Sequence, residues 1–191
     1  DNDIAVTDHA PGYASAARFV AAAVREAACD VEALPIHVSV TETMGRNAGW
    51  LTAASALARR EPGDGPHLIY LPERTFCMDH FLEDVERLYR QRGGVVVVCS
   101  EGLRGEDGRF VGAPVFTSGR SLYPSYAGIH LADAVTRELG IKARYEKPGL
   151  CERSSIPWQS GVDREEAELV GREAVRAALE GIGGIMIGIE R

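Results

Sequence analysis

Cysteine and histidine are too few and too scattered in this sequence to build a structural metal site. The 191 residues contain four cysteines and five histidines, and no two cysteines form a C-x-x-C pair. Such pairs supply the usual spacing of structural zinc ligands, so a zinc site of this kind is not expected. Isolated thiols in an acidic chain of this length are typical of a reducing compartment, which predicts a cytoplasmic location.

Long apolar runs and a surplus of positive charge are also missing. The apolar segments are short strands or alanine-rich helix faces, so we expect neither a membrane span nor a signal peptide. Lysine and arginine number 21 against 28 aspartates and glutamates, which gives a net charge of −7. A broad surface for nucleic acid or anionic membranes is therefore not expected, and an anionic substrate would need a local basic cluster. The first residue is not methionine, and we interpret the chain as a fragment or an excised domain.

What the sequence does contain is a regular alternation of helix-like and strand-like segments. The run from Val95 to Ser100 is apolar almost throughout, as in a strand that is covered on both faces. The alternation predicts an α/β fold with three α/β/α layers and a mainly parallel sheet. Residues 102–125 are expected to be mostly loop. The expected helices span residues 14–28, 48–60, 79–92, 126–139 and 164–180, and the expected strands span residues 36–41, 67–71, 95–100, 142–146 and 184–189.

The most informative segment is residues 42–50, where a β-branched strand pattern gives way to a helical pattern. It reads Glu-Thr-Met-Gly-Arg-Asn-Ala-Gly-Trp, so that glycines lie on both sides of Arg46. A strand that enters a helix through such a loop places free backbone N–H groups and a guanidinium at the carboxyl edge of a sheet. This combination suits a phosphate or another anion.

Three carboxylates are further candidates for chemistry. Asp1 and Asp3 lie two residues apart, and paired carboxylates can hold Mg²⁺ or act as a general base, although a solvated terminus is the more common explanation. Glu101 follows the expected strand 95–100, at the edge where α/β proteins bind ligands. It could accept hydrogen bonds from sugar hydroxyls or cap a turn before Gly102, and the pattern leaves both possibilities open.

Two arginines stand nine residues apart near the end of the chain. Arg144 lies in an expected strand and Arg153 in the loop that follows it. Each could bind a phosphate through two hydrogen bonds, a geometry that lysine cannot match. The alternative is that Arg144 is an edge-strand residue in a surface ion pair with Glu146 or Glu152, which would contribute little.

Taken together, these segments resemble the phosphofructokinase family. The resemblance extends over nearly the whole chain, and its most specific elements are the Asp-Asn-Asp and Met-Gly-Arg motifs in this order. Residues 42–50 are most similar to the pyrophosphate-using branch. The matching pieces, in family order, are Asp1-Asn2-Asp3 with Thr7-Asp8 and Gly12, Met44 to Trp50, Leu71-Pro72-Glu73, Ser100-Glu101-Gly102, Arg144 with Arg153, and Asp163 with Glu166-Ala167, Val170-Gly171 and Ala174-Val175.

The resemblance implies a phosphotransferase that phosphorylates the 1-hydroxyl of fructose 6-phosphate to give fructose 1,6-bisphosphate, with pyrophosphate as donor. It implies that Asp1 is the catalytic base and that Asp3 is the second acidic catalytic residue, near Mg²⁺ and the transferring phosphoryl group. By the same resemblance, Glu101 binds sugar hydroxyls and Arg153 binds the sugar phosphate. Arg144 would reach that phosphate from a neighbouring subunit, in a homodimer or homotetramer. The segment that holds fructose 6-phosphate is Met44, Gly45 and Arg46.

Three departures from the family pattern concern the phosphate contacts and the choice of donor, and one of them is that the loop at residues 113–128 lacks the acidic-aromatic-Gly-His sequence expected of the pyrophosphate branch. Where the ATP-using relatives have an arginine before the Met-Gly-Arg motif, this chain has His37, and Leu150 replaces the usual histidine three residues before Arg153. These changes favour a non-allosteric pyrophosphate enzyme over an allosteric ATP enzyme. The ATP-dependent 6-phosphofructokinase and a non-catalytic sugar-phosphate-binding module remain as alternatives.

The resemblance also implies a division of the chain into three parts. Residues 1–12 would be a catalytic loop from the donor domain, residues 13–152 the sugar-phosphate-binding domain, and residues 153–191 a segment that returns to the donor domain. The donor-phosphate loop, the main metal carboxylate and the residues that distinguish ATP from pyrophosphate would all precede Asp1. We therefore expect the 191-residue polypeptide alone to transfer no phosphate, an expectation that measurable formation of fructose 1,6-bisphosphate by the purified chain would contradict.

Overall fold

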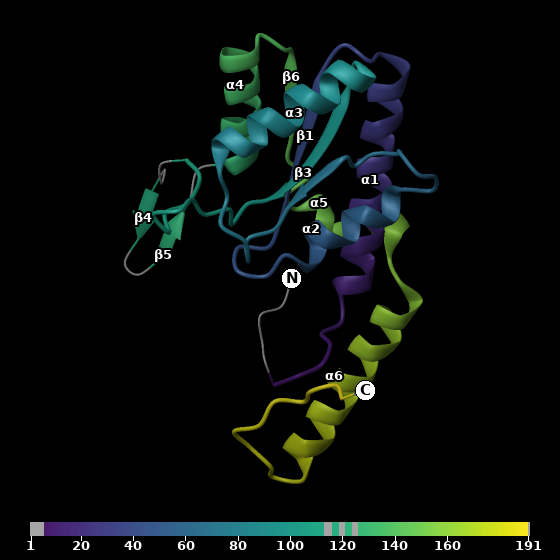
Figure 1. Ribbon diagram of the computed structural model, residues 1–191. Coiled ribbons are helices and arrows are strands. Elements are labelled where there is room, and N and C mark those ends of the chain that lie inside the picture. The colour runs from purple at the N-terminus through teal and green to yellow at the C-terminus, as the bar shows by residue number, and fades with distance from the viewer. Residues whose placement is uncertain (1–5, 113–115, 119–120, 124–125, 191) are drawn as a thin grey trace.

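The protein consists of a sheet with helices on both faces and one long helix that extends away from it (Figure 1). The computed structural model describes residues 6–112, 116–118, 121–123 and 126–190. The helices are α1 (Tyr13–Ala33), α2 (Trp50–Ala54), α3 (Met78–Arg92), α4 (Ala127–Leu139), α5 (Cys151–Ser154) and α6 (Gly161–Leu179), with 3₁₀ turns η1 (Ser55–Ala58) and η2 (Ile156–Trp158). The strands are β1 (Val38–Thr43), β2 (Leu68–Tyr70), β3 (Val95–Ser100), β4 (Phe116–Ser118), β5 (Ser121–Tyr123) and β6 (Ala143–Glu146).

The main sheet has four parallel strands in the order β2-β3-β1-β6. The two central strands are in register to their ends, so that Thr43 of β1 lies opposite Ser100 of β3. On the other side of β1, Ser39 lies opposite Arg144 of the edge strand β6. The loops that follow β1 and β3 therefore begin next to each other at the carboxyl edge of the sheet.

One face of the sheet is covered by α1. Val20, Val24 and Ala28 of this helix pack against Val96 and Val98 of β3, and all five side chains are almost completely buried. Their spacing on α1 follows the helical period, while β3 contributes every second residue to this face. Burial of each of these valines contributes about 1.5–3 kcal/mol relative to exposure.

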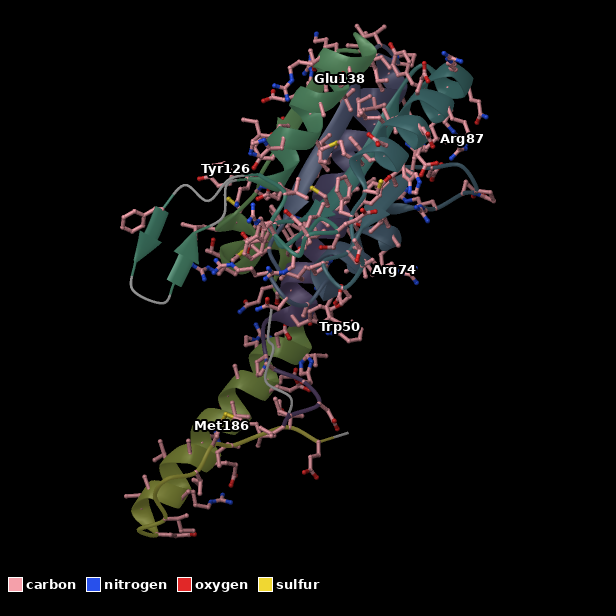
Figure 2. All side chains as sticks on the ribbon, turned by 60° about the vertical axis from the view of Figure 1, so that its left-hand side comes forward. Trp50, Arg74, Arg87, Tyr126, Glu138 and Met186 are labelled. Atoms are coloured by element: carbon pink, nitrogen blue, oxygen red, sulfur yellow. The ribbon has the colours of Figure 1, made fainter. Side chains whose placement is uncertain are left out.

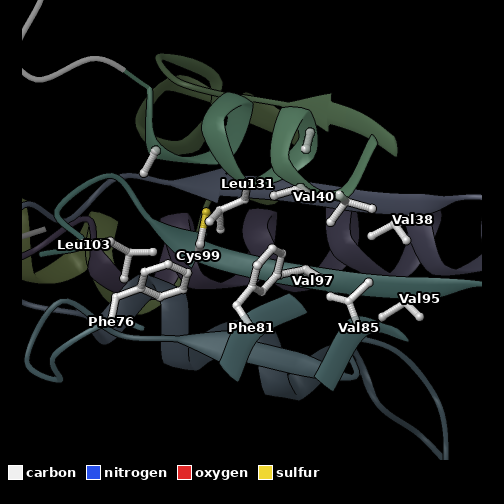
Figure 3. Close-up of a cluster of buried hydrophobic side chains, with 13 residues drawn as sticks. Val38, Val40, Phe76, Phe81, Val85, Val95, Val97, Cys99, Leu103 and Leu131 are labelled. Carbon is white, nitrogen blue, oxygen red and sulfur yellow. The ribbon is translucent and has the colours of Figure 1, made fainter. Parts of the chain in front are cut away.

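The opposite face is covered by α3 and α4. Phe81 and Val85 of α3 and Leu131 of α4 pack on Val97 and Cys99 of β3, which alternate with the residues that face α1 (Figure 3). Since β3 is buried on both faces, its continuous apolar sequence is explained. The predicted three-layer α/β/α fold with a parallel sheet is confirmed.

The expected final strand is wrong. Within the described chain, residues 184–189 make only an isolated bridge between Ile189 and His9. Gly184 has a φ of +71°, a left-handed conformation that interrupts an extended segment. A second difference is the antiparallel pairing of β4 with β5, which the sequence does not reveal because three-residue strands are too short for alternation to be recognised.

Helix α6 and the segment after it lie away from the sheet, which Figure 2 shows from a second direction. Apolar side chains remain exposed along this region, among them Leu169, Val175 and Leu179 on the helix and Ile185 beyond it. Among the described residues, no helix combines the length and the apolar character that crossing a membrane requires.

Candidate functional site

The loops after β1 and β3 are fastened to each other at the carboxyl edge of the sheet. The Glu101 N–H donates to the Thr43 carbonyl over 3.0 Å, and the Ser100 hydroxyl donates to the Gly45 carbonyl over 2.5 Å. Gly102 is required here, because a Cβ at this position would lie 1.9 Å from the carbonyl oxygen of Arg46. The close approach brings the Met-Gly-Arg segment and Glu101 together.

Helix α2 and its preceding loop are held from the other side by Glu73. The Gly49 N–H, at the start of α2, donates to Glu73 Oε1 over 2.7 Å. A Cβ on Gly49 would lie 2.7 Å from Cδ of Pro72. The matched Leu-Pro-Glu segment thus supports the loop that carries Arg46.

A cavity of about 660 Å³ opens where these loops meet the start of α1 and α5. It is called the strand-end cavity below. In its wall, Arg46 and Arg153 are exposed and Glu101 is partly buried. Five of the residues predicted from the sequence line this cavity, namely Met44, Gly45, Arg46, Glu101 and Arg153.

Arg144 lies elsewhere, in a separate cavity of about 330 Å³ on the side of the sheet that faces α1. It is called the sheet-side cavity below, and His37 lines it together with Ser39 and Thr41 of β1. Among the described residues, Arg144 forms no ion pair with Glu146 or Glu152. Glu152 is buried and lines the strand-end cavity instead. The assignment of Arg144 to a neighbouring subunit stays a prediction.

Asp1 and Asp3 lie outside the described residues. Their roles as catalytic base and as the acidic residue near Mg²⁺, like the three-part division of the chain, stay predictions.

The sequence reasoning missed a buried carboxylate behind the strand-end cavity. Glu42 is completely buried, and it accepts hydrogen bonds from the Gly128 N–H over 2.8 Å and from Lys147 Nζ over 2.7 Å. Lys147 Nζ also lies 3.5 Å from Glu101 Oε2. Burial disfavours the ammonium, but the hydrogen bond and charge of Glu42, with those of Glu101, raise the pKa of Lys147 above its usual value. A glutamate in a strand covered on both faces requires a partner, which is the signal that could have revealed this pair.

A second buried carboxyl group, Glu152, lies in the wall of the strand-end cavity. Its Oε2 accepts a hydrogen bond from the Met44 N–H over 3.0 Å. Burial raises the pKa of Glu152 to about 7; the Met44 N–H lowers the pKa, while the charge of Glu101 raises it. Burial therefore favours the neutral form of this group at pH values where an exposed glutamate is ionised.

One cluster of possible metal ligands occurs among the described residues. Single donor atoms of His9, Asp163 and Glu166 lie within 4.8 Å of one another. His9 Nε2 is 2.7 Å from Glu166 Oε2, and Asp163 Oδ2 accepts hydrogen bonds from the backbone and hydroxyl of Ser15, each over 2.6 Å. Since Mg²⁺ prefers an all-oxygen set, this histidine-containing cluster does not fit the predicted magnesium.

Asp163 directly precedes the expected helix 164–180, and the structure places it in the first turn of α6. Its buried side chain has a further role, because it fastens α6 to α1. Burial opposes its negative charge, but the hydrogen bonds from Ser15 and Gly12 and the charge of His9 together outweigh this and lower the pKa of the carboxyl group.

Comparisons with known proteins show which proteins this chain is similar to. The family model described as Phosphofructokinase matches residues 1–178. A pyrophosphate–fructose 6-phosphate 1-phosphotransferase from Xanthomonas campestris pv. campestris is 42% identical over 197 aligned positions, which cover 100% of this chain and 47% of the relative. A sulfofructose kinase from Alkalicoccus urumqiensis is 37% identical, with 100% of this chain and 50% of the relative covered.

Solved structures show the same similarity. The crystal structure of a pyrophosphate-dependent phosphofructokinase from Marinobacter aquaeolei superposes with a TM-score of 0.81 at 33% identity, covering 100% of this chain and 45% of the other. The chain thus spans about half the length of the curated relatives and solved structures that it matches.

Proposed function

The chain belongs to the phosphofructokinase family, and we propose that it supplies the sugar-phosphate side of a pyrophosphate-dependent 6-phosphofructokinase. The observation that carries the proposal is the strand-end cavity, in which two exposed arginines and a carboxylate converge at the carboxyl edge of the sheet. A sugar phosphate has the complementary chemistry, with an anion at one end and hydroxyl donors along the rest. Parallel α/β sheets bind ligands at this edge.

In this proposal each wall of the strand-end cavity has its own task. Arg153 and Arg46 bind the 6-phosphate through charge-assisted hydrogen bonds, which hold it more firmly than neutral donors would. Glu101 accepts hydrogen bonds from sugar hydroxyls, and Lys147 at 3.5 Å keeps its carboxylate oriented. Binding at these two points fixes the direction of the sugar, which is the main requirement of phosphoryl transfer.

The proposed chemical step begins at Asp1. Its carboxylate takes the proton from the 1-hydroxyl while that oxygen forms a bond to the terminal phosphorus of pyrophosphate. The bond between this phosphorus and the bridging oxygen breaks, and inorganic phosphate leaves with the electron pair. Asp3 remains the predicted acidic residue near Mg²⁺.

Arg144 is proposed to serve a second copy of the chain. It is exposed and lies in the sheet-side cavity, apart from the residues that would hold the sugar of its own protomer. A homodimer or homotetramer that brings this arginine to the neighbour's strand-end cavity would add a second guanidinium to the phosphate.

Two alternatives concern the ligands of this proposed enzyme. ATP could replace pyrophosphate as donor, and the 37% identical relative named sulfofructose kinase makes sulfofructose a second candidate substrate. A third alternative is a module that binds the sugar phosphate and catalyses nothing.

The proposal is tested with the full-length gene product that contains this chain. Calorimetry measures the affinity for fructose 6-phosphate and for sulfofructose, and a product assay measures turnover with pyrophosphate and with ATP. We expect fructose 6-phosphate to bind more tightly and pyrophosphate to be the better donor. Asp1→Asn should lower turnover by about 10²–10⁴ with little change in sugar affinity, the scale for losing a general base. Turnover that survives this change while sugar affinity collapses would contradict the assignment.

A further inference from the structure

Glu152 is a buried carboxyl group for which the proposed chemistry has no task. The residue is 2% exposed, although it lies on the four-residue helix α5 next to the exposed Arg153. Oε2 accepts the hydrogen bond from the Met44 N–H, whereas Oε1 has no hydrogen-bond partner among the described residues. The nearby Lys147 forms its ion pairs with Glu42 and Glu101 instead. The backbone of Gly149 and the charge of Lys147 offset part of the cost of the negative charge, but burial outweighs them, so the site favours the neutral acid.

The charged and titratable groups around Glu152 come from each segment that surrounds it. Glu101 after β3 contributes negative charge, and Lys147 before α5 contributes positive charge. Glu152 lines the strand-end cavity and also a cavity of about 350 Å³ between α5 and the start of α6. The titratable or charged groups that share these two cavities with it, besides Glu101, are Tyr13 on α1, Arg46 after β1, Arg153 on α5, and Asp163 and Arg164 on α6. None of these cations is in an ion pair with Glu152 among the described residues, so desolvation is the dominant influence, and the pKa of Glu152 is raised to about 7.

We propose that Glu152 is a positioning residue that must be neutral for the strand-end cavity to bind a sugar phosphate, so that its ionisation weakens binding. This inference rests on the proposed function. In the neutral state Oε2 holds the Met44 N–H at the start of the loop that carries Arg46, and the proton occupies Oε1. Glu101 is then the one carboxylate of the described cavity wall that bears a charge.

Loss of the proton places a second negative charge in the wall of the strand-end cavity, on the residue that directly precedes Arg153 in the sequence. That charge repels the phosphate of the ligand and competes with it for the guanidinium. A side chain of the same shape that cannot ionise would still accept the hydrogen bond from the Met44 N–H, and it would not compete with the phosphate for the guanidinium. Glutamine has this property, which makes Glu152→Gln the matched variant.

The test compares the full-length gene product with its Glu152→Gln variant. Calorimetry gives the dissociation constant of fructose 6-phosphate between pH 6 and pH 8.5 for both proteins. We expect wild-type binding to weaken about tenfold between pH 6 and pH 8 relative to the variant, as follows for one inhibitory ionisation near pH 7. The ligand phosphate also ionises in this pH range, and it affects both dissociation constants equally. Dividing one constant by the other at each pH cancels this contribution. Glu83→Gln, at an exposed position on α3, is the control and should follow the wild type.

A second readout requires no ligand. The folded-state pKa lies above the usual value of 4.5, so the proton stabilises the folded protein. Relative to Glu152→Gln, the wild type should lose thermal stability as pH rises from about 4.5 through about 7 and change little above that, following the linkage between pKa and stability. Equal pH profiles of affinity in wild type and variant, or a folded variant that binds no sugar phosphate at any pH, would overturn the inference. Absence of fructose 6-phosphate binding by the wild type at every pH would instead refute the proposed function, and the inference about binding with it.

Discussion

The strand-end cavity and the sheet-side cavity both contain arginine, but they differ in position and in charge. The strand-end cavity lies where β1 and β3 stop, so loop backbone and two exposed guanidinium groups face the same space. The sheet-side cavity lies along the strands, and its lining combines Arg144 with the carboxylates of Glu26, Asp30 and Glu146. The strand-end cavity therefore has two arginines in its wall, whereas the sheet-side cavity has one arginine and three carboxylates.

The alternation of β1 explains why the second cavity is polar. Val38 and Val40 face the core under α3 and α4, so Ser39 and Thr41 face the α1 side. Arg144 lies opposite Ser39 in the edge strand and extends this polar surface. The strand-end cavity depends instead on a buried ion pair and on close loop packing, so the two regions should respond differently to mutation.

The largest effect is expected for Lys147→Met, behind the strand-end cavity. It would leave Glu42 fully buried without its cation, and breaking such a pair costs about 3–5 kcal/mol. Because the Lys147 side chain is 25% exposed, we expect the lower end of this range. Urea unfolding measures the loss, and Glu146→Gln in the sheet-side cavity is the control, with a change within about 0.5 kcal/mol. Similar losses in the two variants would contradict the contrast between the cavities.

Arg153→Ala should lower the affinity for fructose 6-phosphate by about 10²-fold, which is the loss of about 2.7 kcal/mol of charge-assisted binding. The reduction should be the same in dilute and in concentrated protein, because Arg153 lines the cavity of its own protomer. Calorimetry at two protein concentrations measures it. An unchanged dissociation constant would remove this arginine from the site.

Gly102→Ala should destabilise the protein by about 1–3 kcal/mol, the usual range for overpacking. The added Cβ would collide with the Arg46 carbonyl, so the loops after β1 and β3 would have to separate. Gly161→Ala at the start of α6 is the matched control, since a Cβ there meets no atom within 4 Å. Thermal denaturation distinguishes the two, and an equal shift in both would show that the loop contact is not tight.

The smallest effect is expected for Arg144→Ala, with a loss of affinity of about tenfold, or about 1.4 kcal/mol. It should appear only at concentrations at which the protein is oligomeric, because this arginine lies outside the strand-end cavity of its own chain. Analytical ultracentrifugation alongside calorimetry relates affinity to assembly. Loss of affinity in the monomer would mean that Arg144 acts within one chain.

Most of the fold could be predicted from the sequence because the apolar periodicities are strong. The run from Val95 to Ser100 has to be covered on both faces, and the structure places α1 on one and α3 and α4 on the other. The segment 184–189 has a similar apolar character and forms no strand, since Gly184 is left-handed and a strand needs a neighbour that the pattern does not specify. Periodicity reports on burial, whereas pairing is decided by the rest of the chain.

The site was predicted in part, and the missed residues have a common cause. Met44, Arg46, Glu101 and Arg153 follow strands or lie in marked loops, where a charged residue is noticeable in the sequence. Glu42, Lys147 and Glu152 act through contacts between segments that are distant in the sequence. Glu42 and Lys147, for example, are 105 residues apart. A glutamate in a doubly covered strand signals that it needs a partner, but the identity of that partner becomes visible only when the topology places β1 beside β6.

The central claim is that the strand-end cavity holds fructose 6-phosphate, and a crystal structure of the full-length gene product with this ligand tests it most directly. We predict the 6-phosphate within about 3 Å of the Arg153 guanidinium, the distance of a charge-assisted hydrogen bond, with sugar hydroxyls on Glu101. Fructose 6-phosphate bound in the sheet-side cavity, between Arg144 and His37 of the same protomer, would contradict the account.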